Sequence, residues 1–253
     1  MVIYFKKVID MALSNSVSVI AEEPEYLIIN KPAGLLVHPT QAGGEVTLID
    51  WLIEHYPEVK KVGDEPQLRP GIVHRLDRAV SGVMVIARTG EMFNWLKQQF
   101  VDRKVLKEYL ALVYDPIKRS EGEISLPIQK GKVKTKVMPR GSENEATRIK
   151  TAVTFFEVFQ LFQHYTLLKV RINTGRTHQI RAHLSFYGHS VVGDRKYCHP
   201  RYINRTAFTK FIKFDRVFLH ASTIGFFDCT SKWRQYQADL PAELTDFLKT
   251  LSG

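Results

Sequence analysis

The feature that most constrains the fold is the stretch 71–87, where a charged loop runs directly into a short apolar run. Residues 83–87 read Val-Met-Val-Ile-Ala, and such a run between turn residues predicts a buried β-strand. The sequence HRLD at 74–77 and a Ser-Gly turn at 81–82 precede this strand. A loop held by a sheet can present a reactive side chain. Asp77 is therefore a candidate reactive group, although a carboxylate beside Arg75 can equally be a structural ion pair.

The rest of the chain alternates predicted strands and helices, with more strands than helices. Strands are predicted at 17–21, 26–30, 107–114, 151–162 and 165–172, and helices at 47–56, after a Thr89 cap, at 179–187 and at 241–251. Residues 59–70 are polar and predict a loop, and residues 1–15 predict a short helix or partly ordered arm. Strands joined by short turns indicate an α+β fold with a largely antiparallel sheet. We expect residues 16–253 to form a single domain.

Composition narrows the class of protein. No run of 18 apolar residues exists, so the sequence predicts no membrane span. The first residues show no basic segment leading into a long apolar stretch, which argues against a secretory signal. Cys198 and Cys229 belong to no Cys-x-x-Cys or Cys/His metal pattern. Reduced thiols, no metal and a cytoplasmic location are the expectations.

The net charge of +10 is unevenly distributed along the chain. Residues 1–64 carry 5 Lys/Arg and 9 Asp/Glu, and two later blocks, 130–150 and 195–216, are strongly basic. A basic block can be solvated surface only, but two of them fit a track for a polyanion such as RNA. Within the first block a lysine stands at every second position of 130–136. An extended backbone would point all four ammonium groups to one face.

A second motif, GRTHQIR at 175–181, changes the interpretation of Asp77. Together with HRLD and the Ser-Gly step it resembles the RluA family of pseudouridine synthases. The likeness extends from about residue 19 to 227, in the family's order, and also takes in the stretches 30–38, 107–109, 193–197 and 219–221. One departure is Val80, which stands where the family usually has Thr, and this puts a hydroxyl contact near the loop in doubt.

The resemblance implies the pseudouridine synthase fold, a long mixed and mostly antiparallel sheet with flanking helices and a central catalytic cleft. It also implies that uridine is isomerised to pseudouridine in RNA, a reaction that requires no cofactor. Asp77 would be the catalytic carboxylate, attacking C6 of the base or C1′ of the sugar, or removing the 2′ proton. Arg181 would pair with that carboxylate, and Tyr109 would stack against the displaced uracil.

Further residues are expected to bind the substrate. Arg75 can fill the stack that a flipped nucleotide leaves, and His74 can assist or be hydrogen-bonded within the loop. Arg176, Thr177, His178 and Gln179 are expected to shape the pocket wall. RNA contacts are expected from Lys132, Lys134 and Lys136. His38 and His220 are expected to be structural.

The favoured function is an RNA pseudouridine synthase acting on structured RNA, with ribosomal RNA preferred to transfer RNA. A basic RNA-binding protein of the same fold without catalysis is the first alternative, although such a protein needs none of Asp77, Tyr109 and Arg181. A carboxylate-dependent hydrolase is the second, but that chemistry usually needs two carboxylates. Asp194 is the other candidate carboxylate. The sequence gives no indication of the oligomeric state.

Overall fold

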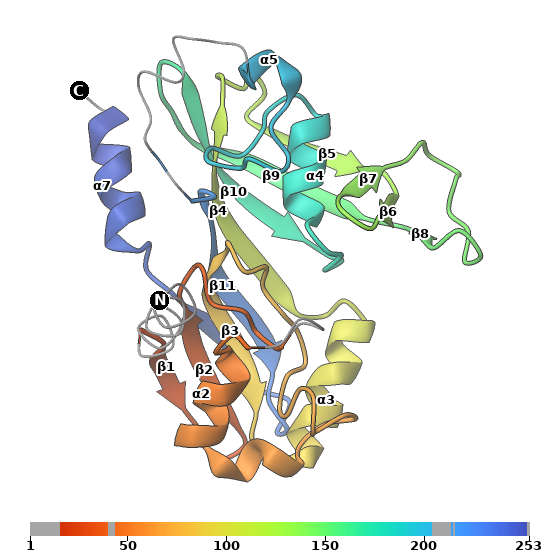
Figure 1. Ribbon diagram of the computed structural model, residues 1–253, viewed down its shortest axis with the longest axis vertical. Helices are drawn as coiled ribbons and strands as arrows, with labels where there is room; N and C mark the ends of the chain where they lie inside the picture. Colours follow the sequence, from red (N-terminus) through yellow and green to blue (C-terminus); the bar gives the residue numbers. More distant parts are fainter. Residues whose placement is uncertain (1–15, 40–43, 204–213, 215, 252–253) are drawn as a thin grey trace. The chain divides into compact units, whose positions relative to one another are not determined.

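The computed structural model describes residues 16–39, 44–203, 214 and 216–251, so the predicted arm at 1–15 lies outside the described residues. The chain divides into two compact units (Figure 1). Unit 1 comprises Met1–Lys107 and Ala221–Asp239, and unit 2 comprises Glu108–His220 and Leu240–Gly253. Whether residues 16–253 act as a single domain stays a prediction.

Unit 1 is built on a mostly antiparallel sheet with a fully buried strand. Its strands are β1 (Ser18–Glu22), β2 (Tyr26–Lys31), β3 (Ser81–Ala87), β11 (Leu219–Phe227) and β12 (Trp233–Gln237), in the order β1-β2-β3-β11 with β12 paired to β11. All seven residues of β3 are buried, which confirms the predicted strand. The strand begins at Ser81, so the Ser-Gly pair is part of the strand and the predicted turn there is wrong. Gly82 has φ +125°, and a Cβ there would lie 2.2 Å from the Ala221 carbonyl oxygen, so only glycine fits.

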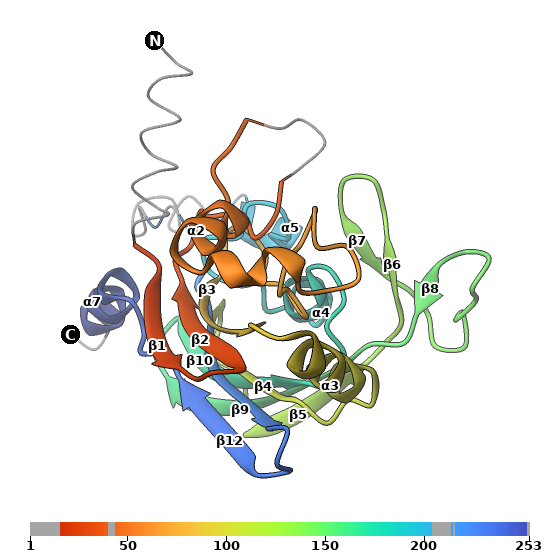
Figure 2. The ribbon, with the colours of Figure 1, turned by 90° about the horizontal axis from the view of Figure 1, so that it is seen from below.

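Among its described residues, unit 1 also contains two α-helices and a short 3₁₀-helix. They are α2 (Leu48–His55), η1 (Pro57–Lys61) and α3 (Gly90–Val101). Figure 2 shows α2 and α3 on the same side of the unit's sheet. Thr89 caps α3 as predicted, because its hydroxyl accepts the Met92 N–H at 3.2 Å. The loop predicted from residue 59 is wrong for its first residues, since a proline at the first position starts the 3₁₀-helix.

Unit 2 contains two antiparallel sheets. The larger has the order β4-β10-β9-β5 and the smaller β7-β6-β8. Their strands are β4 (Leu106–Tyr114), β5 (Glu121–Ser125), β6 (Ile128–Lys130), β7 (Thr135–Val137), β8 (Ile149–Lys150), β9 (Val153–Leu161) and β10 (Tyr165–Ile172). β9 and β10 form the predicted antiparallel pair. The strand predicted at 165–172 is confirmed, and in β10 only Lys169 and Arg171 are exposed.

The described part of unit 2 includes the helices α4 (Gln179–Phe186), α5 (Pro200–Ile203) and α7 (Ala242–Leu251). In Figure 1, α4 lies across one face of the larger sheet, and it contacts β9 and β7. Gly188 follows α4 with φ +94°, the left-handed conformation that ends many helices. The α+β class with a large, mostly antiparallel sheet is confirmed. In the described part of the chain, no helix is long and apolar enough to cross a membrane.

The arrangement expected for the lysines at 130–136 is wrong. Lys130 ends β6 and Lys136 lies in β7, and the chain turns between them. Gly131 allows the turn, because a Cβ there would lie 2.5 Å from the Lys134 carbonyl oxygen. Lys130 pairs with Thr135, and Lys136 pairs with Gln129. Since residues directly opposite share a face and successive residues alternate, Lys130 and Lys136 point to opposite faces.

Candidate active site

Backbone hydrogen bonds hold the loop that carries Asp77. The Asp77 carbonyl accepts the Val80 N–H at 3.0 Å, and the Arg78 carbonyl accepts the Gly34 N–H at 2.7 Å. In addition, Nε of Arg78 donates a hydrogen bond to the Gly34 carbonyl oxygen at 2.9 Å. Asp77 itself is half-buried, and Val80 is buried at 2% exposure. The backbone N–H of Val80 therefore closes the turn, and its apolar side chain packs inward.

A buried lysine supports the segment against which this loop rests. Lys31 is fully buried at the end of β2. Its Nζ donates to the carbonyl oxygens of Pro32 at 2.7 Å and Leu35 at 2.9 Å. These bonds stabilise the turn that presents Gly34 to Arg78. Lys31 was not among the predicted site residues, although a lysine at the end of the largely apolar strand β2 was the available signal.

His74 is held inside unit 1 by contacts on its edge and face. Its Nε2 accepts the Val85 N–H at 3.1 Å, and its ring stacks on Phe100 with centroids 4.9 Å apart. The Lys107 ammonium lies 5.5 Å from the same Phe100 ring. Burial and the charge of Lys107 lower the pKa of His74 to about 3, while burial and Arg103 lower the pKa of Lys107 to about 8. A neutral His74 thus anchors the loop to β3, and a contact with substrate stays a prediction.

Arg75 points away from that anchor. It is exposed, and its Nη1 donates to Nε2 of His38 at 2.9 Å. Its neighbours His74 and Leu76 are less exposed, and Leu76 is buried. The loop therefore fixes the backbone on both sides of Arg75 and leaves its side chain accessible.

Arg181 is buried on α4 and holds a carboxylate of its own unit. Its Nε donates to Oδ2 of Asp194 at 2.6 Å and its Nη2 to Oδ1 at 2.9 Å, a bidentate pair. Oδ1 of Asp194 also accepts the N–H groups of Lys196 and Tyr197, each at 3.0 Å. The Arg181 guanidinium lies 5.1 Å from the centre of the Tyr197 ring. Asp194 thus organises this loop, which weakens the alternative in which it is the second carboxylate of a hydrolase.

The residues just before Arg181 divide into two groups. Gln179 is buried, accepts from Thr174 Oγ1 at 2.7 Å and donates to the Val153 carbonyl at 2.9 Å. His178 has φ 56° and its Nδ1 lies 2.8 Å from the Tyr197 hydroxyl. These two side chains are engaged inside unit 2. Arg176 and Thr177, by contrast, line an open cleft.

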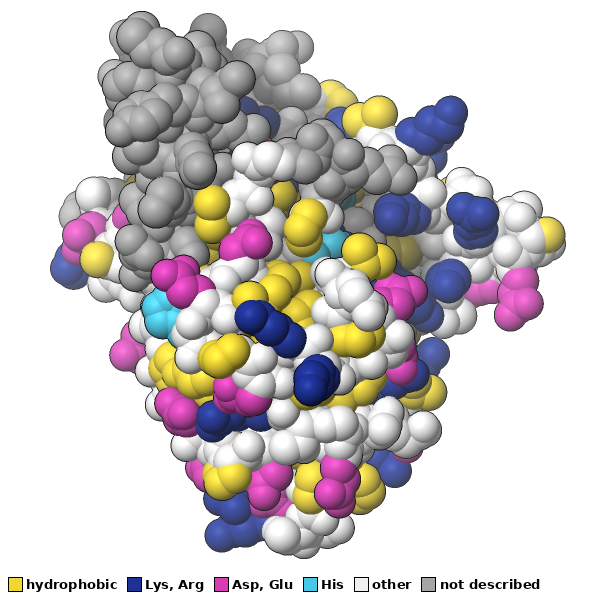
Figure 3. Space-filling model, turned by 60° about the horizontal axis from the view of Figure 1, so that its bottom comes forward, with side chains coloured by type: hydrophobic (Ala, Val, Ile, Leu, Met, Phe, Trp, Pro, Cys, Tyr) yellow, Lys and Arg dark blue, Asp and Glu magenta, His cyan; other side chains and the backbone are white. Residues whose placement is uncertain are grey.

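That cleft has a volume of about 490 Å³ and a basic lining. It is lined by Ile128, Lys130, Thr135, Glu145, Arg148, Lys150, Gly175, Arg176 and Thr177. In Figure 3, Lys and Arg side chains gather around the lobe that projects at the right, where β6, β7 and β8 lie. The predicted contacts Lys132, Lys134 and Lys136 are exposed on the same small sheet or its turn. Arg148 and Lys150 were missed as site residues, because sequence shows the charge of a block and not which side chains converge.

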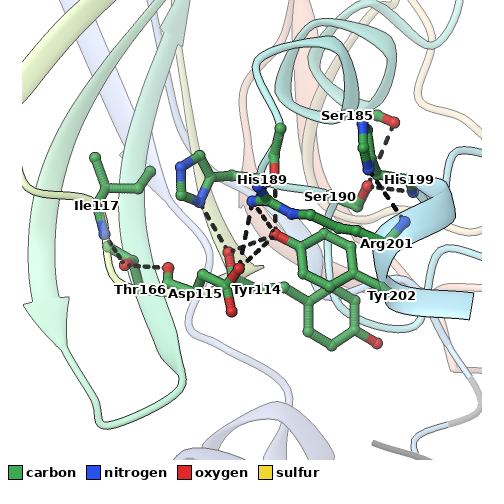
Figure 4. Close-up of polar contacts among 11 residues, drawn as sticks. Tyr114, Asp115, Ile117, Thr166, Ser185, His189, Ser190, His199, Arg201 and Tyr202 are labelled. Atoms are coloured by element: carbon green, nitrogen blue, oxygen red, sulfur yellow. Dashed lines mark hydrogen bonds and ion pairs between the residues drawn. The ribbon is translucent and has the colours of Figure 1, made fainter. Parts of the chain in front are cut away.

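The second basic block uses part of its charge internally. Arg201 lies 3.3 Å from Oδ2 of Asp115 and contacts the Gly188 carbonyl and the Tyr202 hydroxyl (Figure 4). The Tyr202 ring packs on Tyr114 with centroids 4.7 Å apart. Arg216 donates to Oε1 of Glu243 at 2.6 Å. Residues 204–213 of this block lie outside the described residues.

Tyr109 lies on β4 opposite Val170 and is 8% exposed. It belongs to unit 2, as does Arg181, whereas Asp77 belongs to unit 1. The assembly of these three residues into one site stays a prediction. Among the described residues, no group of three or more His, Cys, Asp or Glu could hold a metal ion.

Comparisons with known proteins agree with this geometry. The model of the RNA pseudouridylate synthase family matches residues 25–186. The chain is 34% identical over 231 residues to the uncharacterized RNA pseudouridine synthase YlyB of Bacillus subtilis, covering 91% of this chain and 71% of that protein. It is 33% identical over 234 residues to ribosomal large subunit pseudouridine synthase D of Zymomonas mobilis, covering 92% and 72%.

Solved structures extend the likeness to the fold. The human RNA pseudouridylate synthase domain containing 4 matches with a TM-score of 0.73 at 23% identity, over 98% of this chain and 97% of that one. Because the sequence identity is only 23%, this match supports the fold and not the function. Taken with the family match, it shows that the chain belongs to the RNA pseudouridylate synthases and is an isomerase that converts uridine to pseudouridine in RNA.

Proposed function

We propose that this enzyme modifies large-subunit ribosomal RNA and that Asp77 is its catalytic carboxylate. The observation that carries the choice of RNA is the likeness to relatives named ribosomal large subunit pseudouridine synthase D, which are 30–33% identical over more than 90% of this chain. The same relatives carry no information on the position modified. We also propose a cytoplasmic location, which rests on the cysteine pattern.

The loop around Asp77 supports its proposed role. A carboxylate that attacks carbon or removes a proton must be held in a fixed position. The bonds from Val80 and Gly34 hold the carbonyl groups of Asp77 and Arg78, and His74 ties the preceding residues to β3. Asp77 is half-buried, so one side of it is accessible to a ligand. Attack at C6, attack at C1′ and removal of the 2′ proton are all compatible with this support.

In the proposed site, Arg181 and Tyr109 complete the catalytic set. A guanidinium has five N–H donors, of which Arg181 uses two for Asp194. The proposal assigns further donors to Asp77, so that Asp194 orients the arginine and the arginine stabilises the catalytic anion. Tyr109 would stack on the displaced uracil. No cofactor is assigned, because isomerisation changes neither the oxidation state nor the composition of the nucleotide.

The basic cleft of unit 2 supports the binding of an RNA backbone. Lys130, Arg148, Lys150 and Arg176 line it and face the single acidic residue Glu145. Phosphate contacts of this kind supply affinity and position the RNA without reading its sequence. Arg75 in unit 1 would replace the target uridine in its stack, since the reacting atoms cannot be reached inside a paired helix.

Mapping pseudouridine across all RNA of cells with and without the gene tests the proposed target. We expect carbodiimide-blocked primer extension to show the loss of one or a few pseudouridines from large-subunit ribosomal RNA in the deletion strain. Re-expression of the wild-type chain should restore them. Loss confined to transfer RNA would contradict the proposed target.

A further inference from the structure

In the described part of the molecule, the Arg75 guanidinium has a side-chain hydrogen bond to His38. The two residues are 37 positions apart, and Nη1 of Arg75 donates to Nε2 of His38 at 2.9 Å. Arginine has no acceptor, so the imidazole must offer a lone pair at Nε2 and carry its proton at Nδ1. Arg75 is exposed, and a long exposed side chain without such a contact would sample many rotamers.

His38 is held on a rigid support. The two residues before it, Leu36 and Val37, accept hydrogen bonds from the first N–H groups of α2, Leu48 at 2.8 Å and Ile49 at 3.2 Å. Val37 is also buried, at 3% exposure. The segment that carries His38 is thereby fixed to the start of a helix, independently of the HRLD loop.

The surroundings of His38 favour the form that accepts a hydrogen bond. Burial, and then the positive charges of Arg75 and Arg69, lower the pKa of the imidazole from its usual range. Its Nδ1 is buried and has no hydrogen-bond partner among the described residues. Leaving a buried donor unpaired costs free energy, and the hydrogen bond from Arg75 gives a reason for a histidine at this position.

We propose that His38 is a positioning residue that holds the Arg75 guanidinium ready to enter the RNA as the target uridine leaves the helix. The inference rests on the proposed role of Arg75. It revises the expectation that His38 is only structural. Fixing the guanidinium before binding reduces the conformational entropy lost when it enters the stack. His38 then affects the rate of base extrusion through Arg75 and makes no contact with the reacting atoms.

A double-mutant cycle tests the proposal on total RNA from the deletion strain, with purified full-length enzyme in excess. His38→Leu keeps an apolar side chain of similar size and removes the acceptor. We expect it to lower the single-turnover rate about tenfold, as is usual for coupled residues in hydrogen-bond contact, with RNA affinity nearly unchanged. In an Arg75→Ala background the same substitution should have no further effect. His38→Gln places an acceptor at a similar reach and should recover most of the rate.

Two results would overturn the proposal. One is a wild-type rate in His38→Leu. The other is a double variant slowed by the product of the two single effects, because additivity means that His38 does not act through Arg75. If His38→Leu folds poorly, the Gln variant and its own cycle with Arg75→Ala decide. His55→Leu in α2 is the matched control and should leave the rate unchanged.

The proposed target can fail separately from this inference. If the wild type modifies transfer RNA in place of ribosomal RNA, the target is wrong, and the cycle is read at the site that is modified. If Asp77→Asn makes as much pseudouridine as the wild type, the proposed catalytic role is wrong. Neither result requires a change in the coupling between His38 and Arg75.

Discussion

The Asp77 loop of unit 1 and the Arg181 helix of unit 2 hold opposite charges in different ways. Asp77 is half-buried on a loop that is held by backbone hydrogen bonds and by the side chains of Arg78 and His74. Arg181 is buried, and its side chain is fixed by a bidentate bond to Asp194 and by the Tyr197 ring. We therefore expect a substitution of Asp77 to leave the backbone bonds of its loop in place. A substitution of Arg181 also removes the bonds that hold Asp194.

This difference determines what a substitution in each region measures. A substitution that leaves the backbone hydrogen bonds of its loop in place reports mainly on function. A residue that holds a buried partner combines a loss of function with a loss of stability.

The largest effect is expected from Asp77→Asn. The amide keeps the size of the side chain but can neither attack carbon nor take a proton at neutral pH, so pseudouridine formation should fall below detection. RNA binding should stay within a few fold, because phosphate contacts are untouched. The measurement is primer extension on RNA from a deletion strain complemented with either form, together with binding of the purified proteins. Equal product from both forms would refute the role of Asp77.

Arg181→Met should damage both activity and stability. It leaves Asp194 buried at 4% exposure without its cation, and losing one partner of a buried pair costs about 3–5 kcal/mol. Arg181→Lys keeps the charge but loses the fork geometry, so it should recover part of the stability and a small part of the activity. Urea unfolding and turnover should be measured on both variants. A Met variant as stable as the wild type would remove the contrast with Asp77.

Reversing the charge of Lys132, Lys134 and Lys136 to Glu should weaken RNA binding without affecting the chemistry. Each phosphate contact contributes a salt slope near 0.7–0.9, so log K against log salt should become shallower by about 2 to 3. The loss of affinity should be larger at low salt than at high salt. Titrations of a structured RNA at several salt concentrations measure the slope.

A charge-matched control distinguishes RNA contacts made by these three lysines from the attraction of RNA to any positively charged surface. Lys60, Lys61 and Lys118 are exposed and lie outside the two basic blocks. Changing these three to Glu removes the same total charge and should alter the slope much less. Equal slopes for both triple variants would mean that the β6–β7 turn is ordinary solvated surface.

The last prediction concerns the pH dependence of stability, whose effect near neutral pH is the smallest of the four. The pKa of His74 is about 3 in the folded protein, below its ordinary value of 6.5. Its contribution is therefore fully present above pH 6.5 and is lost as the pH falls from there toward about 3. The wild type should lose about 1.4 kcal/mol more per pH unit in this window than His74→Phe. Parallel curves of unfolding free energy for the two proteins would contradict a neutral, buried His74.

Sequence reasoning was most successful where local patterns determine structure. The apolar run of β3, the alternation along β10 and the Thr89 cap each depend on neighbours within a few residues. It failed where a turn interrupts a regular pattern. The alternating lysines suggested one face, but Gly131 turns the chain between β6 and β7 and sends Lys130 and Lys136 to opposite faces.

Long-range partners were also beyond sequence reasoning. The two basic blocks look alike in sequence. In the structure, residues of the first block line an open cleft. In the second block, Arg201 forms an ion pair with Asp115, and Arg216 forms one with Glu243. Nothing in the local sequence distinguishes a lysine that meets solvent from an arginine that meets a carboxylate many residues away.

The sequence by itself determined the family and its reaction, because the HRLD and GRTHQIR motifs carry chemistry in the identity and order of their residues. Only the tertiary structure decided the partner of each charged group in these motifs: Val85 for His74, His38 for Arg75 and Asp194 for Arg181. The physical reason is the distance along the chain between the groups that interact. Chemical identity belongs to a single residue, whereas burial, hydrogen bonding and pKa depend on groups that folding brings together from distant parts of the chain.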